Sequence, residues 1–189
     1  MPTRHGATPV NHAITTFNHV PLPSTALLGP IGESAITHQQ FIASLWRIAV
    51  GTLALSFVVV PALQVASHVA YNYSVRRKIG DPAQGLTPII SFRTQQLPIF
   101  SAVAQSYVLV AFQKHAVRLF TDTSLDPRAR HGIATTWKAT VMQHSQASHF
   151  ALAERLGAQG VFDHNHLAAQ LVSGLLAPFF PVLTLNFSE

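Results

Sequence analysis

The feature that most constrains the fold is the stretch from residue 126 to residue 165, which reads DPRARHGIATTWKATVMQHSQASHFALAERLGAQGVFDHN. Asp126 can accept a hydrogen bond from a backbone N–H of a first helical turn, and Pro127 fits that turn because it has no N–H to lose there. Between residues 128 and 156 there is no further proline, and Gly132 is the only glycine. The pattern predicts one long helix that ends at Gly157 and Gly160, since glycine tolerates the left-handed conformation found just past a helix end.

The composition is unusually apolar for a soluble monomer. Of 189 residues, 48% are hydrophobic and 10% are charged, which predicts one domain whose faces are buried in an oligomer or against a membrane. The net charge of +5, with eleven histidines besides, suits an anionic ligand such as a nucleotide. Lysine and arginine are scattered without interleaved aromatic residues, which disfavours nucleic-acid binding. The absence of cysteine excludes disulfides, thiolate metal sites and cysteine nucleophiles.

Three further helices are predicted upstream, over residues 37–58, 61–77 and 94–120, with Pro98 placed in the first turn of the last one. Gly80-Asp81-Pro82 is typical of a turn between the second and third. Four long helices in succession favour a mostly α fold, an up-down four-helix bundle over residues 37–170. The apolar faces predicted for the first and third helices consist of Phe41, Leu45, Ile48, Thr52 and Leu55, and of Ile99, Val103, Val110, Val117 and Phe120.

Both ends of the chain differ from this pattern. Residues 1–36 predict strand and loop, with a β-branched run at residues 13–17, and they are too few to form a β domain. Residues 171–189, LVSGLLAPFFPVLTLNFSE, are apolar but show neither helical periodicity nor strand alternation. Residues 48–70 are long enough to span a membrane, and residues 171–187 are near the minimum length. Pro61, Gln64 and His68 favour buried bundle helices for the first stretch, two prolines near the centre make the second a poor span, and membrane insertion remains a weaker alternative.

Two histidine-containing groups predict no chemistry of their own. His164 and His166 lie beside Asp163, but side chains at i and i+2 of a helix point apart and no third ligand is evident, so no metal site is predicted. Ser145 and Ser148 have histidines nearby, without the strand-turn-helix context and the orienting acid of a hydrolase.

Four separated blocks resemble the C-terminal part of acyl-CoA dehydrogenases and acyl-CoA oxidases, especially oxidase-like fungal flavoproteins. HAITTFNHVPLPSTALLG (residues 12–29) is similar to the strand and exit loop that close the middle β domain of that family. YSVRRKIG (73–80) resembles its Arg-x-x-Phe-Gly turn, and FRTQQLPIF (92–100) the glutamine-containing start of its next helix. GAQG (157–160) stands where the family has a Gly-Gly-x-Gly turn. The blocks occur in the family's order, separated by helices of suitable length.

The resemblance implies a flavoenzyme that oxidises the CH–CH bond of an acyl-CoA thioester, built from subunits that pair as dimers or tetramers with FAD between them. Arg76 matches the arginine that reaches the FAD pyrophosphate, and a guanidinium suits two phosphate oxygens. The other implied cofactor-binding residues are Gln95, Gln96, Gly157, Gln159 and Gly160. The resemblance further implies that residues 1–36 are the end of the middle β domain and its linker, and that residues 171–189 lie outside the family pattern.

The sequence also departs from the family. Ile79 replaces an aromatic residue, Arg93 stands where many relatives have glutamine, and Ala158 and Val161 alter the glycine turn. The family's catalytic glutamate follows that turn in a Glu-Gly pair, whereas no glutamate occurs here between Glu154 and the terminal Glu189. No catalytic residue is therefore assigned, and we expect a truncated chain. The expected location is peroxisomal or cytoplasmic, although the terminus is not Ser-Lys-Leu and the N-terminus has no apolar signal core. The alternative from another class is a non-catalytic, oligomerising helical module.

Overall fold

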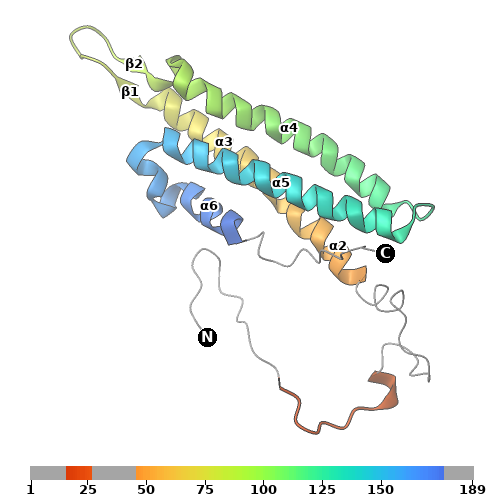
Figure 1. The fold of residues 1–189 in the computed structure, drawn as a ribbon. Helices are drawn as coiled ribbons and strands as arrows, with labels where there is room; N and C mark the ends of the chain where they lie inside the picture. The colour runs from red at the N-terminus through yellow and green to blue at the C-terminus, as the bar shows by residue number, and fades with distance from the viewer. Residues whose placement is uncertain (1–15, 27–45, 177–189) are drawn as a thin grey trace.

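The computed structural model describes residues 16–26 and 46–176, and this part of the chain is mostly helical, which confirms the predicted mostly α class. From residue 59 onward, helices lie side by side and the chain direction alternates from one to the next (Figure 1). The helices are α2 (Trp46–Leu55), α3 (Val59–Arg76), α4 (Arg93–Thr121), α5 (Pro127–Arg155) and α6 (Leu167–Leu176). Helices α3, α4 and α5 pack against one another pairwise, and the short α6 packs on α5 and α3.

The first two predicted helices form one continuous rod. A 3-10 turn at Ser56–Val58 joins α2 directly to α3, and the helical run extends over Trp46–Arg76. The Ser56 hydroxyl donates to the carbonyls of Thr52 (3.0 Å) and Leu53 (2.8 Å), which tightens the chain locally without reversing it. Pro61 is the third residue of α3, where its missing N–H removes no intrahelical bond. The predicted division into two helices is found, with the break at Ser56–Val58 and α3 beginning at Val59, but the chain does not reverse there, so the two helices form one rod and not two neighbouring members of a bundle.

The next two helices agree closely with the sequence. Helix α4 extends one residue beyond each end of the predicted 94–120, and α5 begins at Pro127 with the Asp126 carboxylate accepting the Arg128 N–H at 2.7 Å. Pro98 is the sixth residue of α4, so its placement in the first turn is wrong. The Thr94 carbonyl consequently lacks an N–H from residue 98, and the Arg155 guanidinium donates to it instead at 3.3 Å.

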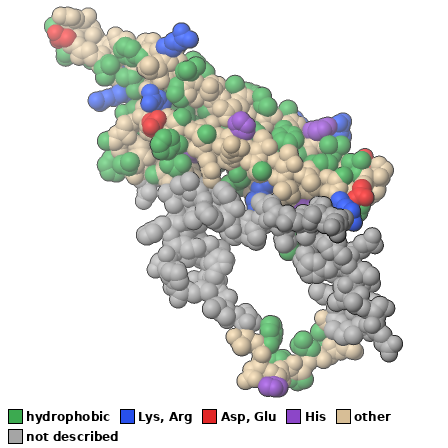
Figure 2. All heavy atoms as spheres, in the orientation of Figure 1, with side chains coloured by type: hydrophobic (Ala, Val, Ile, Leu, Met, Phe, Trp, Pro, Cys, Tyr) green, Lys and Arg blue, Asp and Glu red, His purple; other side chains and the backbone are tan. Residues whose placement is uncertain are grey.

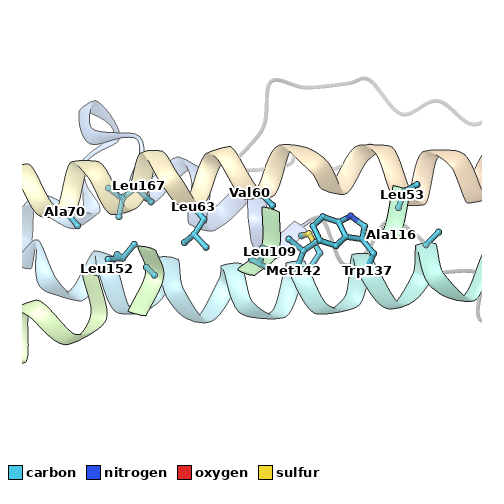
Figure 3. Close-up of a cluster of buried hydrophobic side chains, with 14 of the residues drawn as sticks. Leu53, Val60, Leu63, Ala70, Leu109, Ala116, Trp137, Met142, Leu152 and Leu167 are labelled. Atoms are coloured by element: carbon cyan, nitrogen blue, oxygen red, sulfur yellow. The ribbon is translucent and has the colours of Figure 1, made fainter. Parts of the chain in front are cut away.

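A continuous apolar core runs along the inner sides of these helices (Figure 3). Trp137 on α5 is fully buried and meets Phe57 and Phe112 edge-on, with ring centroids 6.1 and 5.3 Å away. Leu63, Leu152 and Leu167, from α3, α5 and α6, extend the core toward the other end. At the end near Trp137, the Arg130 guanidinium lies 4.5 Å from the centre of the Trp46 ring, and Trp46 stacks on Phe120 at 5.0 Å.

The inward face of the first helix differs from the prediction. Thr52 is buried as predicted, but Leu55 is 71% exposed and Ile48 is 41% exposed, and Ala49 and Leu53 point inward in their place. In the third helix Ile99 and Phe120 are buried as predicted, with Val103, Val110 and Val117 half-buried around them. The reason is that α2 is apolar on all sides, so hydrophobic spacing does not single out one inner face.

Several predictions concern the ends of the chain. Residues 16–26, with Phe17, form loop and one 3-10 turn at Ser24–Ala26, so no strand is found in this part of the predicted strand region. Residues 13–15 lie outside the described residues. The predicted helix start at residue 37, with Phe41 and Leu45, lies outside them too. The boundary predicted at residue 170 falls inside α6, so residues 171–176 are helical; residues 177–189 are outside the described part.

Between α3 and α4 the chain forms a small antiparallel hairpin that the sequence did not predict. β1 (Lys78–Ile79) pairs with β2 (Thr87–Pro88) across a loop in which Gly80 and Gly85 both have positive φ, 125° and 104°. A Cβ on Gly80 would lie 2.8 Å from the Gly85 carbonyl oxygen, so the loop requires glycine at position 80.

Among the described residues, Trp46–Arg76 is the helical run long and apolar enough to cross a membrane by length and composition, with a mean hydropathy of 2.1 over an 18-residue part of it. A third of that 18-residue part is buried inside the protein. A core helix of a soluble protein meets the same criterion, so this finding by itself does not decide between the two environments.

Candidate functional site

The candidate site lies at the end of the helices where α3 ends, α4 begins and α5 ends. Gln95, in the first turn of α4, is buried and holds the three helices together. Its amide donates to the Ser74 hydroxyl of α3 and to the Arg155 carbonyl of α5, both at 2.8 Å. Both amide hydrogens are therefore used within the protein, so Gln95 holds the ends of α3 and α5 in place and does not face the site surface.

The first hollow at this end opens beside the last turns of α3. It has a volume of about 500 Å³ and is lined by His68, Val69, Asn72, Tyr73, Arg76 and Arg77. Arg76 is the last residue of α3, and both it and Arg77 are exposed. Within the described residues neither guanidinium forms an ion pair with a carboxylate. The first hollow is therefore lined by two adjacent arginine side chains, and none of its other lining residues is an aspartate, glutamate or lysine.

The glycine turn that follows α5 is a 3-10 turn at Gly157–Val161. Gly157 has a φ of 55°, which favours glycine because a side chain there would be strained. Gly160 is buried, and a Cβ at this position would collide with the Ala153 carbonyl oxygen of α5. The Asn165 amide contacts the Gln159 carbonyl, and its Oδ1 accepts the Leu167 N–H at 2.8 Å. The turn is thus fixed against both α5 and α6.

A second hollow joins the glycine turn to α3. It has a volume of about 520 Å³ and shares Val69, Tyr73 and Arg77 with the first hollow. Its other lining residues are Leu156, Gly157, Ala158, Gln159, His164 and Asn165. The two hollows adjoin, so Arg76 and the glycine turn lie on neighbouring parts of one surface.

The structure brings together only some of the residues named from the sequence. Arg76, Gly157 and Gln159 line the two hollows, whereas Gln95 and Gly160 are buried behind them. Gln96 is half-buried on α4 and is not among the lining residues of either hollow. Arg77 and His164 complete the surface, and the sequence analysis did not assign them to it. Arg77 directly follows Arg76, but only the fold shows that it is the charged residue among the three shared by both hollows.

The electrostatics of these hollows favour an anion. None of the residues that line them is an aspartate or a glutamate, while Arg76 and Arg77 contribute two positive charges. A guanidinium keeps its charge at all relevant pH values and presents paired donors to phosphate or carboxylate oxygens. The arrangement suits a ligand with two neighbouring anionic groups.

Two other groups of polar side chains have structural roles. His149 is buried on α5; its Nδ1 lies 2.8 Å from the Ser145 carbonyl and its Nε2 lies 3.2 Å from Gln170 Oε1, so it ties α5 to α6. Ser148 donates to Gln105 Oε1 of α4 at 3.0 Å. In the described part of the chain, no three side chains from His, Asp or Glu gather closely enough to hold a metal ion.

No known family model matches this chain, and no curated protein matches it. The candidate site therefore depends on its own geometry and on the resemblance of the short motifs. Of these motifs, the Arg-Arg pair at the end of α3 and the glycine turn after α5 are the two that line the adjoining hollows.

Proposed function

We propose that this surface binds the diphosphate of FAD, and that the chain belongs to a flavoprotein of the acyl-CoA dehydrogenase or oxidase type. The observation that carries the proposal is the sharing of Val69, Tyr73 and Arg77 by the hollow of Arg76 and the hollow of the glycine turn. Residues 76–77 and 157–160 are far apart in the sequence, and the alternating helix directions carry them to the same end. In this proposal α2–α3, α4, α5 and the shorter α6 are the four members of an up-down bundle.

The residues present fit a diphosphate. Arg76 and Arg77 would hold the phosphate oxygens, and the exposed Gly157 would let the ligand approach the backbone closely. Tyr73, shared by both hollows, offers an aromatic wall to the rest of a nucleotide. Each hollow is open and of the size that ligand pockets commonly have, about 300–1,000 Å³. We assign no residue to the flavin ring.

FAD, when bound, supplies a hydride acceptor for the oxidation of an acyl-CoA thioester. The residues described here bind and orient the cofactor, and none of them is proposed as the base that removes the substrate proton. Glu154 is the one glutamate in the described residues; it lies on α5, is exposed, and is 3.6 Å from Arg155 of the same helix. Its position next to Arg155 gives it a local partner outside both hollows.

A titration of the purified full chain with FAD tests this function. Quenching of flavin fluorescence should report saturable binding, and Arg77→Met should weaken it about tenfold or more, because a charge-assisted bond contributes roughly 1.5–3 kcal/mol. Arg118→Met is the matched control, since Arg118 is an exposed arginine in the last turn of α4, at the other end of the helices. Equal losses in both variants would indicate non-specific attraction to a basic protein, and the absence of binding to the wild-type chain would refute the proposal.

The alternative is a non-catalytic helical module that oligomerises. It is favoured by the large apolar side chains exposed on the continuous rod of α2 and α3 and on α4, such as Leu55, Val58 and Val108, which are 71%, 67% and 68% exposed. Visible flavin absorbance that stays with the chain through purification would favour the enzyme. An oligomer that neither carries nor binds flavin would favour the module.

A further inference from the structure

The outer side of α4 carries an apolar stripe with cations at its ends. One row of exposed residues at seven-residue intervals consists of Arg93, Phe100, Tyr107 and Lys114. Residues seven apart in a helix lie two turns apart on the same face, so the two aromatic rings stand in line between the two cations. A second row on this face has the same spacing and is also exposed; its members are Leu97, Ala104, Ala111 and Arg118.

Helix α3 continues this surface across a groove that it forms with α4. The groove has a volume of about 400 Å³, and Tyr71 of α3 lines it together with Phe100 and Tyr107 of α4. Val65 and Val75, on the outer side of α3, are 48% and 39% exposed. We call the outer side of α3 with these residues, the groove, and the two rows of α4 the α3–α4 face. Because α3, α4 and α5 pack against one another pairwise, α5 lies behind this face.

The α3–α4 face has no negative charge, and its positive charges lie at its margins. Helices α2, α3 and α4 contain no Asp or Glu, and residues 48–75 and 94–113 contain no Lys or Arg either. Figure 2 shows one side of the molecule, on which most of the charged side chains lie toward the two ends of the helices and uncharged ones fill the stretch between. In the part of the chain that the structure describes, Arg93, Lys114 and Arg118 form no ion pair with a carboxylate.

The polar side chains of the groove are largely hydrogen-bonded within the protein. Ser67 and Ser106 each donate to a carbonyl of their own helix at 2.8 Å, and the His68 ring is 2.8 Å from the Asn72 amide. A hydroxyl that is already paired with the backbone costs less to remove from water than an unpaired one. Gln64 and the tyrosine hydroxyls are polar as well, and the headgroup layer of a membrane still offers such groups water and polar partners.

We propose that the α3–α4 face lies on a phospholipid bilayer with anionic headgroups, with the helices parallel to the membrane surface. Its apolar side chains enter the boundary between headgroups and acyl chains, and the marginal cations contact lipid phosphates. The charge complementarity favours this occupant, because the face offers cations without acids and such lipids offer the reverse. A second copy of the chain is a poorer occupant, since it would add a second set of cations and no carboxylate to pair with them.

The opposite side of the molecule favours this lying orientation over a spanning one. Gln143 and His144 are exposed near the middle of α5, and Glu154 is exposed toward its end. A spanning orientation would place the two central side chains in hydrocarbon, where no water can bond to them. With the α3–α4 face on the membrane, the outer side of α5 points into water.

Co-sedimentation with vesicles, without flavin, tests the proposal independently of the diphosphate site. The full chain should bind vesicles of phosphatidylcholine mixed with phosphatidylserine more tightly than vesicles of phosphatidylcholine alone, and salt should weaken the difference. Tyr107→Glu should lower the affinity about tenfold or more, because it adds a carboxylate to the apolar stripe. Phe150→Glu is the control: Phe150 is 58% exposed on α5, and its variant should bind like the wild type.

A second pair of variants separates the marginal cations from the hollows. Lys114→Gln should lower the affinity for the anionic vesicles about fivefold and leave binding to the neutral vesicles unchanged, because one basic side chain near the surface is lost. Arg77→Met should retain the sensitivity to Tyr107→Glu. Vesicle binding that is lost in Arg77→Met and kept in Tyr107→Glu would place lipid phosphate in the hollows and overturn the proposal.

A fluorescent label keeps the proposal testable if the glutamate variant folds poorly. The sequence has no cysteine, so Tyr107→Cys and Phe150→Cys each create a single thiol for an environment-sensitive probe. Anionic vesicles should shift the emission of the first probe to the blue and leave the second unchanged. Absence of vesicle binding would overturn the proposal, and so would an oligomer that shields position 107 without lipid. A chain that leaves membranes only with detergent would contradict the lying orientation.

Discussion

The two ends of the helices each use arginine, but in different ways. At the tryptophan end, defined by Trp46, Phe120 and Arg130, the arginine is enclosed: its Nε donates to the Phe120 carbonyl at 2.6 Å and its guanidinium lies over the Trp46 ring. At the glycine end, defined by the Gly157–Val161 turn with Arg76 and Arg77, both guanidinium groups face open hollows.

This difference in surroundings separates an arginine that stabilises the fold, Arg130, from two that are available to a ligand, Arg76 and Arg77. Arg130 is half-buried, donates through Nε to the Phe120 carbonyl and lies over the Trp46 ring, so its removal should affect folding and leave ligand binding unchanged. Arg76 and Arg77 are exposed and form no ion pair within the described residues, so their removal should affect ligand binding and leave folding unchanged. The hydrogen bonds that fix the glycine end come instead from Gln95 and Asn165, which stand behind the hollows.

The largest expected effect is that of Gly160→Ala at the glycine end. The new Cβ meets the Ala153 carbonyl oxygen, and backbone cannot move aside as a flexible side chain can. The free energy of unfolding should fall by about 3 kcal/mol, the upper part of the range for overpacking. Gly132→Ala is the matched control, because it lies within α5 with open space around its Cβ, and it should stabilise by about 1 kcal/mol. Urea unfolding measures both; equal effects would mean that the turn is not packed on α5 as described.

Gln95→Leu should have the next largest effect. It leaves the Ser74 hydroxyl and the Arg155 carbonyl without the amide donor, at a cost of about 2 kcal/mol in unfolding free energy. Because Gln95 does not line either hollow, its loss should weaken flavin binding only through partial unfolding of the glycine end. Binding should therefore recover when the variant is cooled below its unfolding transition. Gln96→Leu, next to it and half-buried, is the control and should change stability little. A Gln95→Leu protein that is fully stable but binds no flavin would instead make Gln95 a direct ligand contact.

The comparison of the two ends is most directly tested by Arg130→Met beside Arg77→Met. Arg130→Met should lower the free energy of unfolding by about 1–2 kcal/mol, through loss of the stacking cation and of the bond to the Phe120 carbonyl. Arg77→Met should leave the melting temperature unchanged and lower flavin affinity. Thermal unfolding gives the melting temperature of each variant, and flavin titration gives its dissociation constant. The distinction between the ends fails if Arg130→Met weakens binding or Arg77→Met destabilises the fold.

Local signals predicted the parts of the fold that depend on local chemistry. The cap at Asp126, the proline at position 127 and the stop at Gly157 defined α5 because each acts within one turn of the backbone. Pro61 marked the start of α3 correctly, but a proline at a helix start looks the same whether the preceding chain reverses or continues straight, so the sequence did not predict the rod. The 3-10 turn at Ser56–Val58, with the hydrogen bonds of the Ser56 hydroxyl, joins the two helices without a reversal.

The site was less predictable because it depends on tertiary packing. The resemblance placed Gln95 and Gln96 on equal terms, yet the fold turns Gln95 inward between Ser74 and Arg155. It also named Arg76 without Arg77, although Arg77 is the arginine that lines both hollows. Which side of a helix meets its neighbours is ambiguous when the outer side is apolar too, as in α2 and α3.

The smallest expected effect concerns Lys138, a buried lysine on α5 that belongs to neither end. Burial disfavours its charged form and lowers the pKa of Lys138 below its ordinary value of 10.5. In the window below pH 10.5 the unfolded chain therefore binds more protons than the folded chain, and stability rises as pH increases through that window. Lys138→Met should remove this rise, whereas Lys114→Met, at an exposed position of α4, should retain it. Chemical unfolding at a series of alkaline pH values measures the slopes; a rise that persists in Lys138→Met would assign it to another group.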